Sequence, residues 1–534
     1  MRPRLDELAA FLRLILRVFF RSVEVVGAER LPLGRPMVLV ANHVNGLIDP
    51  VLILGPLPVR PRLLAKSTLW KNPLVRPFAE LAGAIPIYRH QDQVDTAQNE
   101  ESFARCHEVL AEGGAIALFP EGKSHSEPAL QPLKTGLARI VLGYERKRLS
   151  SPSPGANFDP KAPFGPLEIL PTVETPRGAS PAAAPFISSR NPRDAAGTPG
   201  EGDAPRGVST VGDAPMGPGG EGSSVRIVPV GLTFDAKETF RSRALIQIGE
   251  PIDPSPEVAL DREDNPAAVR SLTARVSRAL EEVTLNYDSW EEARLIVRAA
   301  ELYGRSAVAL PGRRRLAESF PIQRAFLEGY EDLHQRFPDK VEALTEAVRT
   351  YDRLLAAFRL RDDQVAAAYP PSPVFRFVAR TLLRLLIHLP LAIVGTILNW
   401  PTYHLIAFLA PRIARWIPDQ TATYKLFGAV IFFPLTWIAE AILAARWLDT
   451  GWAAPLTLLL APLTAWIALR FHETHTSFWR EAWAYLLLRT RKKVAEELRS
   501  KRQEILNRVA ELEDLWREEG ASGRGTIVPI DDLL

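Results

Sequence analysis

Three long apolar segments in the C-terminal part of the chain constrain its fold more than any other feature of the sequence. They cover residues 386–410, 424–445 and 452–470. Each approaches the roughly 20 residues that a helix needs to cross a hydrocarbon core. We therefore predict a transmembrane region over residues 376–470 with two to four passes, because Pro390 and Pro401 interrupt the first segment.

Arginine and tryptophan residues gather around these segments. Six arginines lie at or near the segment ends: Arg380, Arg384, Arg412, Arg415, Arg446 and Arg470. Six tryptophans lie in the same region: Trp400, Trp416, Trp437, Trp447, Trp452 and Trp466. Such residues are typical of the two membrane–water interfaces. The alternative interpretation is a buried helical hairpin in a soluble domain.

The N-terminal residues 1–34 predict an amphipathic helix. Arg13, Arg17 and Arg21 recur at a spacing of four, which places them on one side of a helix whose remaining surface is largely apolar. The apolar stretch is interrupted by arginines and is followed by no small-residue cleavage site, unlike a signal peptide. We expect this helix to lie in a membrane interface. A helix that caps a soluble core is the alternative.

Length and composition limit the remaining possibilities. A chain of 534 residues is too long for one hydrophobic core and predicts two to four domains. Its net charge of +3 gives no electrostatic reason to expect nucleic acid as a partner. Cys106 is the only cysteine, so neither an internal disulfide nor a cysteine metal cluster can form.

Residues 35–256 predict an α/β sandwich with a largely parallel mixed sheet. The short apolar runs MVLVANH, RLLAKS, AIPIYR and AIALFPEG are bounded by turn residues and alternate with helical patterns. Residues 150–224 break this pattern with Pro, Gly, Ser and Ala, so we expect a disordered insertion there. Strands resume at VRIVPVGLTF, which indicates that the insertion interrupts the sheet.

Two further regions have helical patterns. Residues 257–375 carry helix-spaced apolar residues among mixed charges, which predicts a soluble helical subdomain. Residues 471–534 contain a long charged helix over 480–518 and a tail. The apolar repeat of that helix covers less than three heptads, which favours packing on its own protein over a coiled coil.

The first candidate functional stretch is NHVNGLID, which contains His43 and Asp49. An imidazole can take a proton from a hydroxyl near neutral pH, and a carboxylate on its other nitrogen fixes its tautomer. A separation of six residues across a strand-end loop allows that contact. Alone, the two residues are equally compatible with unrelated polar positions of a loop.

Two more stretches carry polar groups after predicted strands. GAIPIYR contains Gly83 and Arg89, and an arginine at a strand end can present a forked donor to phosphate. LFPEGKSH combines Glu121, Gly122 and Lys123 in a tight turn. A fourth stretch, IVPVGLTF, is an apolar strand.

The triplet GKS in the third stretch does not make a nucleotide-binding phosphate loop. That motif requires a glycine where Ala117 stands. His472 and His475 are three residues apart but have no third ligand beside them in the sequence, so we expect no metal site.

Taken in chain order, the four stretches resemble the four-block signature of the phospholipid/glycerol acyltransferase family. The blocks are a His–Asp pair, G-x-I-x-x-x-R, F-P-E-G and a V-P-V strand. LKTGLARI after the third block resembles the lysine–glycine helix start of that family. The resemblance covers roughly residues 20–255 and implies a glycerolipid-acyltransferase-like sandwich that transfers an acyl group from a thioester to a hydroxyl.

The resemblance implies roles for the matching residues. His43 would act as general base on the acceptor hydroxyl and Asp49 would orient it, so no acyl-enzyme is required. Arg89 would bind the phosphate of the acceptor. Lys66 and Lys123 are weaker candidates for the same phosphate, and a solvated lysine is the alternative at Lys66.

The pocket for the acceptor would be shaped by Glu121 and Gly122, and Gly83 belongs to the second, substrate-binding block. A carboxylate that only stabilises the turn is the alternative role for Glu121. Pro229 and Gly231 would shape the wall on the acyl side.

One departure from the family pattern concerns the first block. Five residues separate His43 from Asp49, where the family usually has four. The form H-x-N-x-x-x-D-P resembles the branch of fungal glycerol-3-phosphate/dihydroxyacetone-phosphate acyltransferases, which also carry hydrophobic segments after the catalytic domain. It implies acylation of glycerol 3-phosphate or dihydroxyacetone phosphate. The alternatives are acylation of 1-acylglycerol 3-phosphate to phosphatidate, and a non-catalytic lipid-binding membrane protein on the same fold.

These inferences define the expected partners. We expect acyl-CoA or acyl-carrier protein as co-substrate, membrane lipids as surroundings, and no cofactor, metal or nucleic acid. We expect an integral membrane protein with its catalytic domain on the cytoplasmic face. The sequence assigns no oligomeric state.

Overall fold

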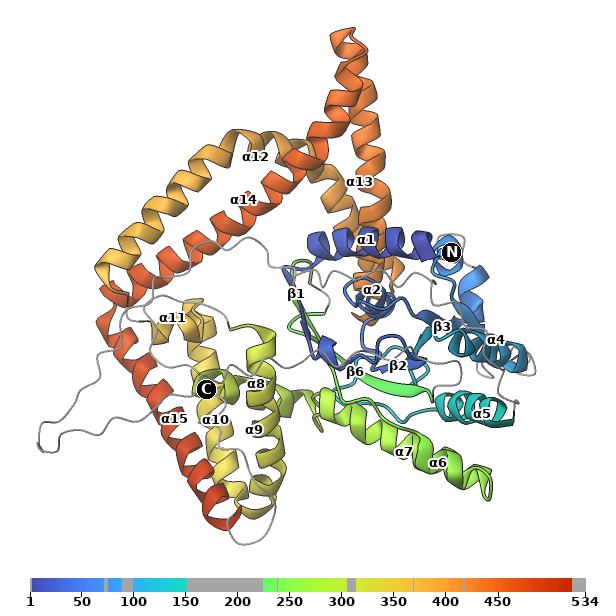
Figure 1. The fold of residues 1–534 in the computed structure, drawn as a ribbon. Coiled ribbons are helices and arrows are strands. Elements are labelled where there is room, and N and C mark those ends of the chain that lie inside the picture. The colour runs from blue at the N-terminus through green and yellow to red at the C-terminus, as the bar shows by residue number, and fades with distance from the viewer. Residues whose placement is uncertain are drawn as a thin grey trace, which may run out of the picture.

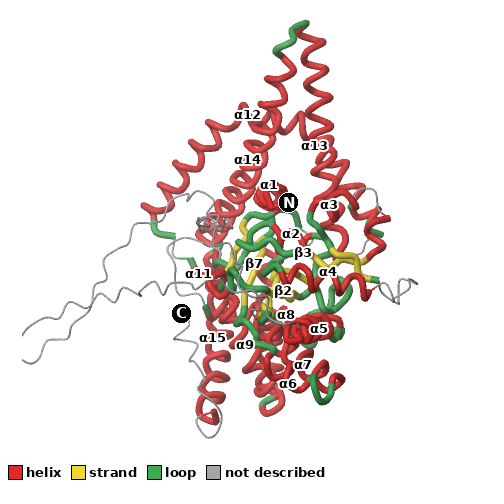
Figure 2. Tube along the Cα trace, turned by 45° about the vertical axis from the view of Figure 1, so that its right-hand side comes forward, coloured by secondary structure: helices red, strands yellow, loops and turns green. Residues whose placement is uncertain are grey.

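The computed structural model describes residues 2–71, 75–88, 99–150, 224–237, 239–304, 314–367, 369–415 and 418–520 (Figure 1). These residues form a sheet domain, a helical domain and three long helices that project from both (Figure 2). Of the predicted insertion over residues 150–224, residues 151–223 lie outside the described residues, as do residues 521–534 of the predicted C-terminal tail.

One seven-stranded sheet has the order β1-β7-β6-β2-β5-β3-β4. The strands are β1 (Ser22–Val26), β2 (Met37–Ala41), β3 (Arg62–Lys66), β4 (Ile85–Ile87), β5 (Ala115–Leu118), β6 (Arg226–Phe234) and β7 (Arg243–Ile248). The five strands from β6 to β4 run parallel, whereas β7 is antiparallel to β6, and β1 is parallel to β7. The predicted largely parallel mixed sheet is confirmed.

The central strand β2 shows why the sheet needs helices on both faces. Val38 and Val40 are buried in one hydrophobic cluster, and Leu39 between them is buried in another. Successive side chains of a strand point to opposite faces, so both faces of β2 are apolar. Burial of each such side chain contributes about 1.5–3 kcal/mol to folding.

Helices cover each face of the sheet (Figure 1). The first face carries α1 (Arg2–Phe19) and α2 (Ile48–Leu54), with α3 (Arg76–Leu81) beside them. The second face carries α4 (Asn99–Ala111), α5 (Gly136–Ser150), α6 (Ser255–Leu260) and α7 (Asn265–Val283). Two short 3₁₀ turns cover Ala28–Arg30 and Ser67–Lys71.

The sheet domain extends further than the predicted boundary at residue 256. The apolar side of α7 is buried in the same cluster as Val38. Gly231 on β6 permits this packing, because a side chain there would collide with the backbone of Val283. The predicted helical subdomain 257–375 therefore included α7, which packs on the sheet instead. Helical periodicity does not identify the surface on which a helix packs.

Helix α1 caps the sheet with one side and leaves another side exposed. The buried side joins the sheet core through three leucines: Leu8, Leu12 and Leu16. The opposite side exposes an apolar row: Phe11, Leu14 and Val18. The helix therefore caps a core, as in the alternative interpretation, and its place in a membrane interface stays a prediction that the exposed row supports.

The helical domain contains α8 (Trp290–Tyr303), α9 (Leu316–Arg336), α10 (Pro338–Phe358), α11 (Asp362–Ala366) and α15 (Lys492–Gly520). The last turns of the third long helix belong to the same core. The sequence predicted one charged helix over 480–518, but Arg491 adopts a non-helical conformation and separates two helices there.

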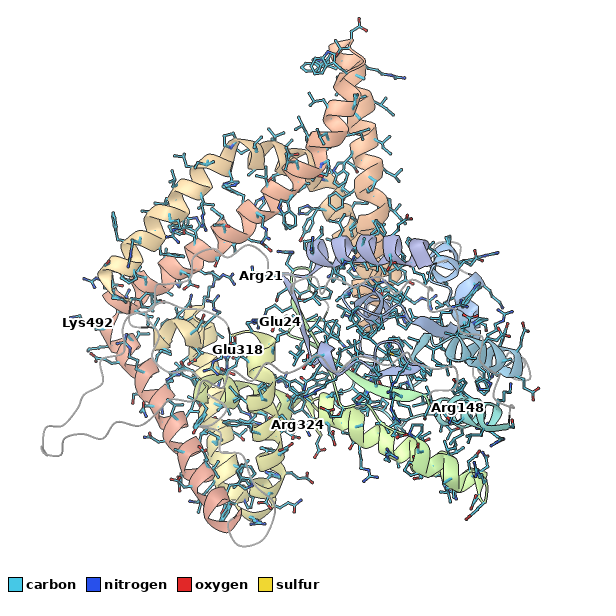
Figure 3. The ribbon with its side chains drawn as sticks, in the orientation of Figure 1. Arg21, Glu24, Arg148, Glu318, Arg324 and Lys492 are labelled. Carbon is cyan, nitrogen blue, oxygen red and sulfur yellow. The ribbon has the colours of Figure 1, made fainter. Side chains whose placement is uncertain are left out.

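A buried carboxylate joins the sheet to the helical domain. Glu24 on the edge strand β1 accepts the backbone N–H groups of Leu316 (3.2 Å) and Ala317 (2.9 Å) at the start of α9 (Figure 3). The first N–H groups of a helix have no partner within it, and the helix dipole favours a negative charge at that end. Glu24 therefore anchors α9 to the sheet.

The three long helices are α12 (Pro371–Ile413), α13 (Pro418–Leu448) and α14 (Ala453–Thr490). Within the described chain they are the helices long and apolar enough to cross a membrane. Several large apolar side chains on them are exposed: Leu386, Ile397, Leu443, Trp447 and Leu459. α12 contains Pro390, Pro401 and Pro411 and bends along its length (Figure 1), as expected where proline removes helix hydrogen bonds.

The two sides of α1 make separate predictions. We expect Leu16→Ala to lower the free energy of unfolding by about 2–5 kcal/mol, because Leu16 is buried in the sheet core. We expect Leu14→Ala to change it by less than about 0.5 kcal/mol, because 58% of Leu14 is exposed. Denaturant unfolding of the purified protein in detergent measures both.

A peptide of residues 2–19, which form α1, provides the membrane part of this test. If α1 lies in the interface, Leu14→Ala weakens binding of that peptide to vesicles with anionic lipids. Unchanged vesicle binding would contradict the interfacial role and leave α1 as a cap only.

Candidate functional site

The loop between β2 and α2 brings His43 and Asp49 together. His43 follows the carboxyl end of β2, and Asp49 is the second residue of α2. The imidazole Nδ1 donates to the Asp49 carboxylate Oδ2 at 2.9 Å. The contact that the predicted acid–base pair requires is therefore present, although five residues lie between its members.

Hydrogen bonds inside the loop explain how the longer spacing closes. The same Oδ2 atom also accepts the backbone N–H groups of Val44 (2.8 Å) and Asn45 (2.7 Å). The N–H groups of Ile48 and Asp49 bond to the carbonyl of Asn45, and Gly46 adopts a positive φ of 39°. The fully buried carboxylate thus folds the loop around itself and the histidine.

These contacts determine which ring nitrogen of His43 can act as a base. Because Nδ1–H is directed at a carboxylate, the free electron pair of the neutral ring lies on Nε2. The ring stacks on Phe119, with centroids 4.2 Å apart, and 17% of the side chain is exposed. The ring is therefore held in place while a small part of the side chain remains accessible.

Glu121 holds the backbone of this loop from the neighbouring strand. Its carboxylate is fully buried at the turn after β5. Oε1 accepts the His43 backbone N–H at 2.6 Å, and Oε2 accepts the Gln131 backbone N–H at 2.8 Å as well as the ring of His125. Gly122 completes the turn with a φ of 76°, which favours glycine. Both carboxylate oxygens bond to protein groups, an arrangement typical of a positioning residue.

The remaining predicted site residues are placed differently. Lys66 ends β3 and Lys123 follows β5, and both are exposed at the sheet edge where β2 also ends. Gly83 lies in the turn before β4, at the opposite edge, and its φ of 61° serves that turn. The structure therefore does not bring Gly83 to His43. Arg89 lies outside the described residues.

Pro229 and Gly231, predicted to shape an acyl-side wall, lie within β6. The carbonyl of Pro229 accepts the Gly249 N–H at 2.9 Å, and Gly231 makes room for the end of α7. These contacts give both residues a packing role inside the sheet domain.

Other polar residues of the site had no separate signal in the sequence. The buried Asn42 exchanges two hydrogen bonds with the backbone of Leu232, which ties the end of β2 to β6. Lys237 donates to the carbonyls of Val44 (3.3 Å) and His125 (3.4 Å). Each loop thus has partners from a distant part of the chain, and a local pattern does not reveal such partners.

Two further features lie away from this site. In the part of the chain that the structure describes, no group of three or more His, Cys, Asp or Glu side chains is arranged to hold a metal ion.

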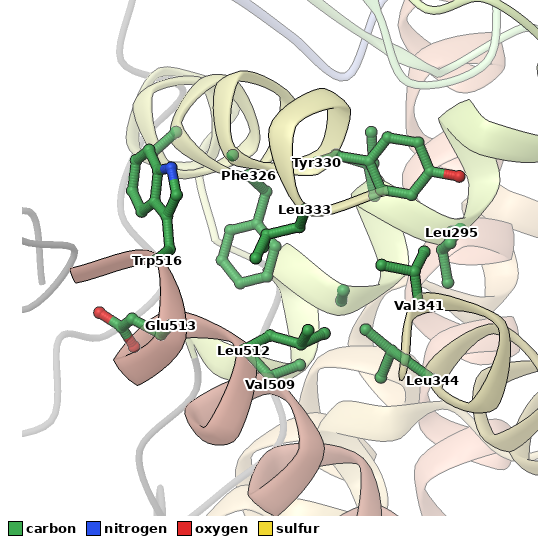
Figure 4. Close-up of a pocket in the computed structure, with 14 residues that line it drawn as sticks. Leu295, Phe326, Tyr330, Leu333, Val341, Leu344, Val509, Leu512, Glu513 and Trp516 are labelled. Carbon is green, nitrogen blue, oxygen red and sulfur yellow. The ribbon is translucent and has the colours of Figure 1, made fainter. Parts of the chain in front are cut away.

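A hollow between α8, α9, α10 and α15 is lined almost wholly by apolar side chains, including Phe326 and Trp516 (Figure 4). Its Glu513 accepts a hydrogen bond from Tyr303.

Two family models match the chain. The model described as Acyltransferase matches residues 22–150, and the model described as Glycerol-3-phosphate acyltransferase 2 C-terminal domain matches residues 295–516. The first range contains His43, Asp49 and Glu121. The second covers most of the helical domain and all three long helices, of which α14 contributes its last turns to the core of the helical domain.

Individual relatives are also similar to this chain. The chain is 24% identical to Glycerol-3-phosphate O-acyltransferase 2 of Saccharomyces cerevisiae over 373 residues, which cover 67% of this chain and 39% of that protein. It is 23% identical to Glycerol-3-phosphate O-acyltransferase 1 of the same yeast over 535 residues, with coverages of 81% and 60%. The matches therefore span less than two thirds of either relative.

A solved structure is also similar to this chain. The crystal structure of a 1-acyl-sn-glycerophosphate acyltransferase from Thermotoga maritima is 18% identical and has a TM-score of 0.29. The match covers 52% of this chain and 79% of that one.

The two suggested roles of Glu121 predict different effects on stability. As a positioning residue, Glu121→Ala leaves two backbone N–H groups without an acceptor, each costing about 1–3 kcal/mol, so the free energy of unfolding falls by about 2–5 kcal/mol. Glu127→Ala is the matched control, because Glu127 is exposed on the same loop. Thermal and denaturant unfolding measure both variants. Equal stabilities would favour a role of Glu121 in binding the acceptor.

Proposed function

Because this chain belongs to the acyltransferase family, we propose that it transfers a fatty acyl group from a thioester to a hydroxyl of glycerol 3-phosphate or dihydroxyacetone phosphate. The observation that carries this proposal is the His43–Asp49 pair, joined at 2.9 Å, in which 17% of the histidine side chain is exposed. The similarity to two yeast proteins named glycerol-3-phosphate O-acyltransferases supports the choice of acceptor.

The proposed reaction needs one base that later acts as an acid. Nε2 of His43 takes the proton of the acceptor hydroxyl while the hydroxyl oxygen attacks the thioester carbonyl. The resulting imidazolium is stabilised by Asp49. Collapse of the tetrahedral intermediate breaks the carbon–sulfur bond, and the imidazolium returns the proton to the leaving thiolate. No covalent acyl-enzyme is involved, because the acceptor itself is the nucleophile.

Cationic side chains would bind the phosphate of the acceptor. We assign this role first to Arg89, on the family resemblance, because a guanidinium can form two parallel hydrogen bonds with a phosphate. Lys66 and Lys123 lie exposed at the sheet edge on which the parallel strands end, so they remain secondary candidates. The glycerol hydroxyl and the phosphate would then be held at one edge of the sheet.

The acyl donor and the location follow from the same proposal. The donor is acyl-CoA or acyl-carrier protein, and the product remains near the bilayer in which it is used. Three helices of sufficient length and apolarity support an integral membrane protein. We propose that its catalytic domain lies on the cytoplasmic face, where soluble acyl thioesters are available.

An assay with competing acceptors tests the proposed substrate. Purified protein in detergent receives one labelled acyl-CoA and either glycerol 3-phosphate, dihydroxyacetone phosphate or 1-acylglycerol 3-phosphate. We expect labelled product with the first or second acceptor. Exclusive use of 1-acylglycerol 3-phosphate would replace the proposal by the synthesis of phosphatidate.

Two variants connect that activity to the site. We expect His43→Ala to lower kcat by about 10²–10⁴-fold, since that is the usual contribution of a general base. Asp49→Asn should lower kcat by a similar factor, because an amide in place of the carboxylate changes the tautomer that the ring adopts. Wild-type activity in His43→Ala would remove the histidine from the mechanism. A lack of activity with every acceptor and donor would favour a lipid-binding protein without catalysis.

Membrane integration has its own test. We expect the full-length protein to stay in the membrane pellet after an alkaline carbonate wash, and to be released by detergent. Its recovery in the wash would show that the long helices do not span the bilayer.

A further inference from the structure

The first turns of α13 are built into the sheet domain. Ala422 and Leu426, one helical turn apart, are buried in the same hydrophobic cluster as α1, α2 and the strands. Phe427 packs edge-on against Phe78 of α3, with ring centroids 5.6 Å apart. A helix that is a candidate membrane span from Gln420 to Leu448 therefore begins inside the domain that holds the candidate active site.

This helix reaches the loop between His43 and Asp49. Five N–H groups of the loop find acceptors within the sheet domain: those of His43, Val44, Asn45, Ile48 and Asp49. The N–H of Leu47 instead donates to the hydroxyl oxygen of Thr423 on α13, at 3.0 Å. Thr423 is 8% exposed, so this hydrogen bond is shielded from competing water.

The position of Leu47 gives this bond its importance. Leu47 directly precedes α2, and Asp49 lies two residues further along in the first turn of that helix. A shift of Leu47 therefore moves the start of α2 and the carboxylate that orients His43. The loop contains one residue more between His43 and Asp49 than the family usually has. Thr423 binds this longer loop at Leu47, just before α2 begins.

The third long helix is connected to the same loop by a second route. Glu473 of α14 forms an ion pair with Arg241. The Arg241 guanidinium also donates a hydrogen bond to the carbonyl of Phe20, the residue that directly follows α1. Arg241 lies in the segment between β6 and β7, together with Lys237. Lys237 donates to the carbonyl of Val44 and accepts, through its own carbonyl, a hydrogen bond from the Asn45 side chain.

We propose that Thr423 is a positioning residue of the active site, through which the candidate membrane helix α13 sets the geometry of the His43–Asp49 pair. This inference rests on the proposed acyl transfer at His43. It makes α13 part of the catalytic unit as well as a candidate anchor.

The test compares three variants of hydroxyl side chains in detergent and in vesicles. Thr423→Val keeps the shape of the side chain but removes the acceptor for Leu47. Thr423→Ser keeps the acceptor. Thr457→Val is the matched control, because the Thr457 hydroxyl on α14 bonds to the carbonyl of Ala453 in its own helix.

We expect Thr423→Val to lower kcat by about 3–30-fold, corresponding to the loss of one hydrogen bond and the movement that follows. KM for the acyl donor should change by less than twofold, because the proposed role of Thr423 is to orient the loop of His43 and Asp49. Thr423→Ser should recover most of kcat. Thr457→Val should behave as the wild type. Thr423→Val should remain folded with a modestly lower melting temperature, because the Leu47 N–H loses its acceptor.

Three outcomes would overturn the inference. They are an unchanged kcat in Thr423→Val, an equal loss in Thr457→Val, and no recovery in Thr423→Ser. If Thr423→Val does not fold, Thr423→Ala replaces it in the same comparison. His43→Ala measured in parallel separates the two proposals: if it is inactive while Thr423→Val is normal, only the role of Thr423 fails, and if it is active, the proposed function fails first.

Discussion

The buried carboxylate of Asp49 is the interaction on which the candidate active site depends. A fully buried carboxylate is costly to fold unless it is hydrogen-bonded, and here one oxygen accepts three N–H groups from its own loop. These contacts give the loop its shape and orient His43, whereas the other oxygen, Oδ1, has no hydrogen-bond partner among the described residues. Glu121, in the turn after the neighbouring strand, binds protein groups with both carboxylate oxygens and holds the His43 backbone. Two buried charges thus make the loop rigid without a helix or strand within it.

The parallel sheet explains why these groups meet. β2 and β5 are neighbours and run in the same direction, so the residues after each strand emerge at one edge. His43 follows β2 and Glu121 follows β5, which makes a contact between them a consequence of topology. Gly83 precedes its strand and consequently lies at the other edge. Whether a predicted residue lies near His43 therefore depends on whether it follows or precedes its strand, more than on its distance along the chain.

The same reasoning shows how far the sequence could reach. The order of strands and helices predicted the sheet, and the chemistry of imidazole and carboxylate predicted the His43–Asp49 contact, since both depend on local patterns. The packing of α7 on the sheet and the division of the C-terminal helix at Arg491 did not follow, because periodicity describes a helix but not its partner. The role of Glu121 stayed ambiguous, because two of the donors that its carboxylate binds are backbone N–H groups, which carry no signal in the sequence. Thr423, 376 positions from Leu47, had no local signal at all.

The long helices therefore have two kinds of surface with different physical demands. Their exposed leucines and isoleucines suit lipid, which offers no hydrogen bonds, whereas Thr423 and Glu473 make polar contacts with the sheet domain. Polar groups at the end of an apolar helix are stable only where a protein partner or water forms hydrogen bonds with them. These contacts therefore fix the position along the helices, and so the depth relative to a bilayer, at which the sheet domain is attached. Under the proposed acyl transfer, a site at that depth would release its acylated product close to the bilayer. The hydrogen bond from Leu47 to Thr423 both satisfies a polar group of α13 and holds the loop between His43 and Asp49. The apolar segments that constrain the fold thus also constrain the candidate site.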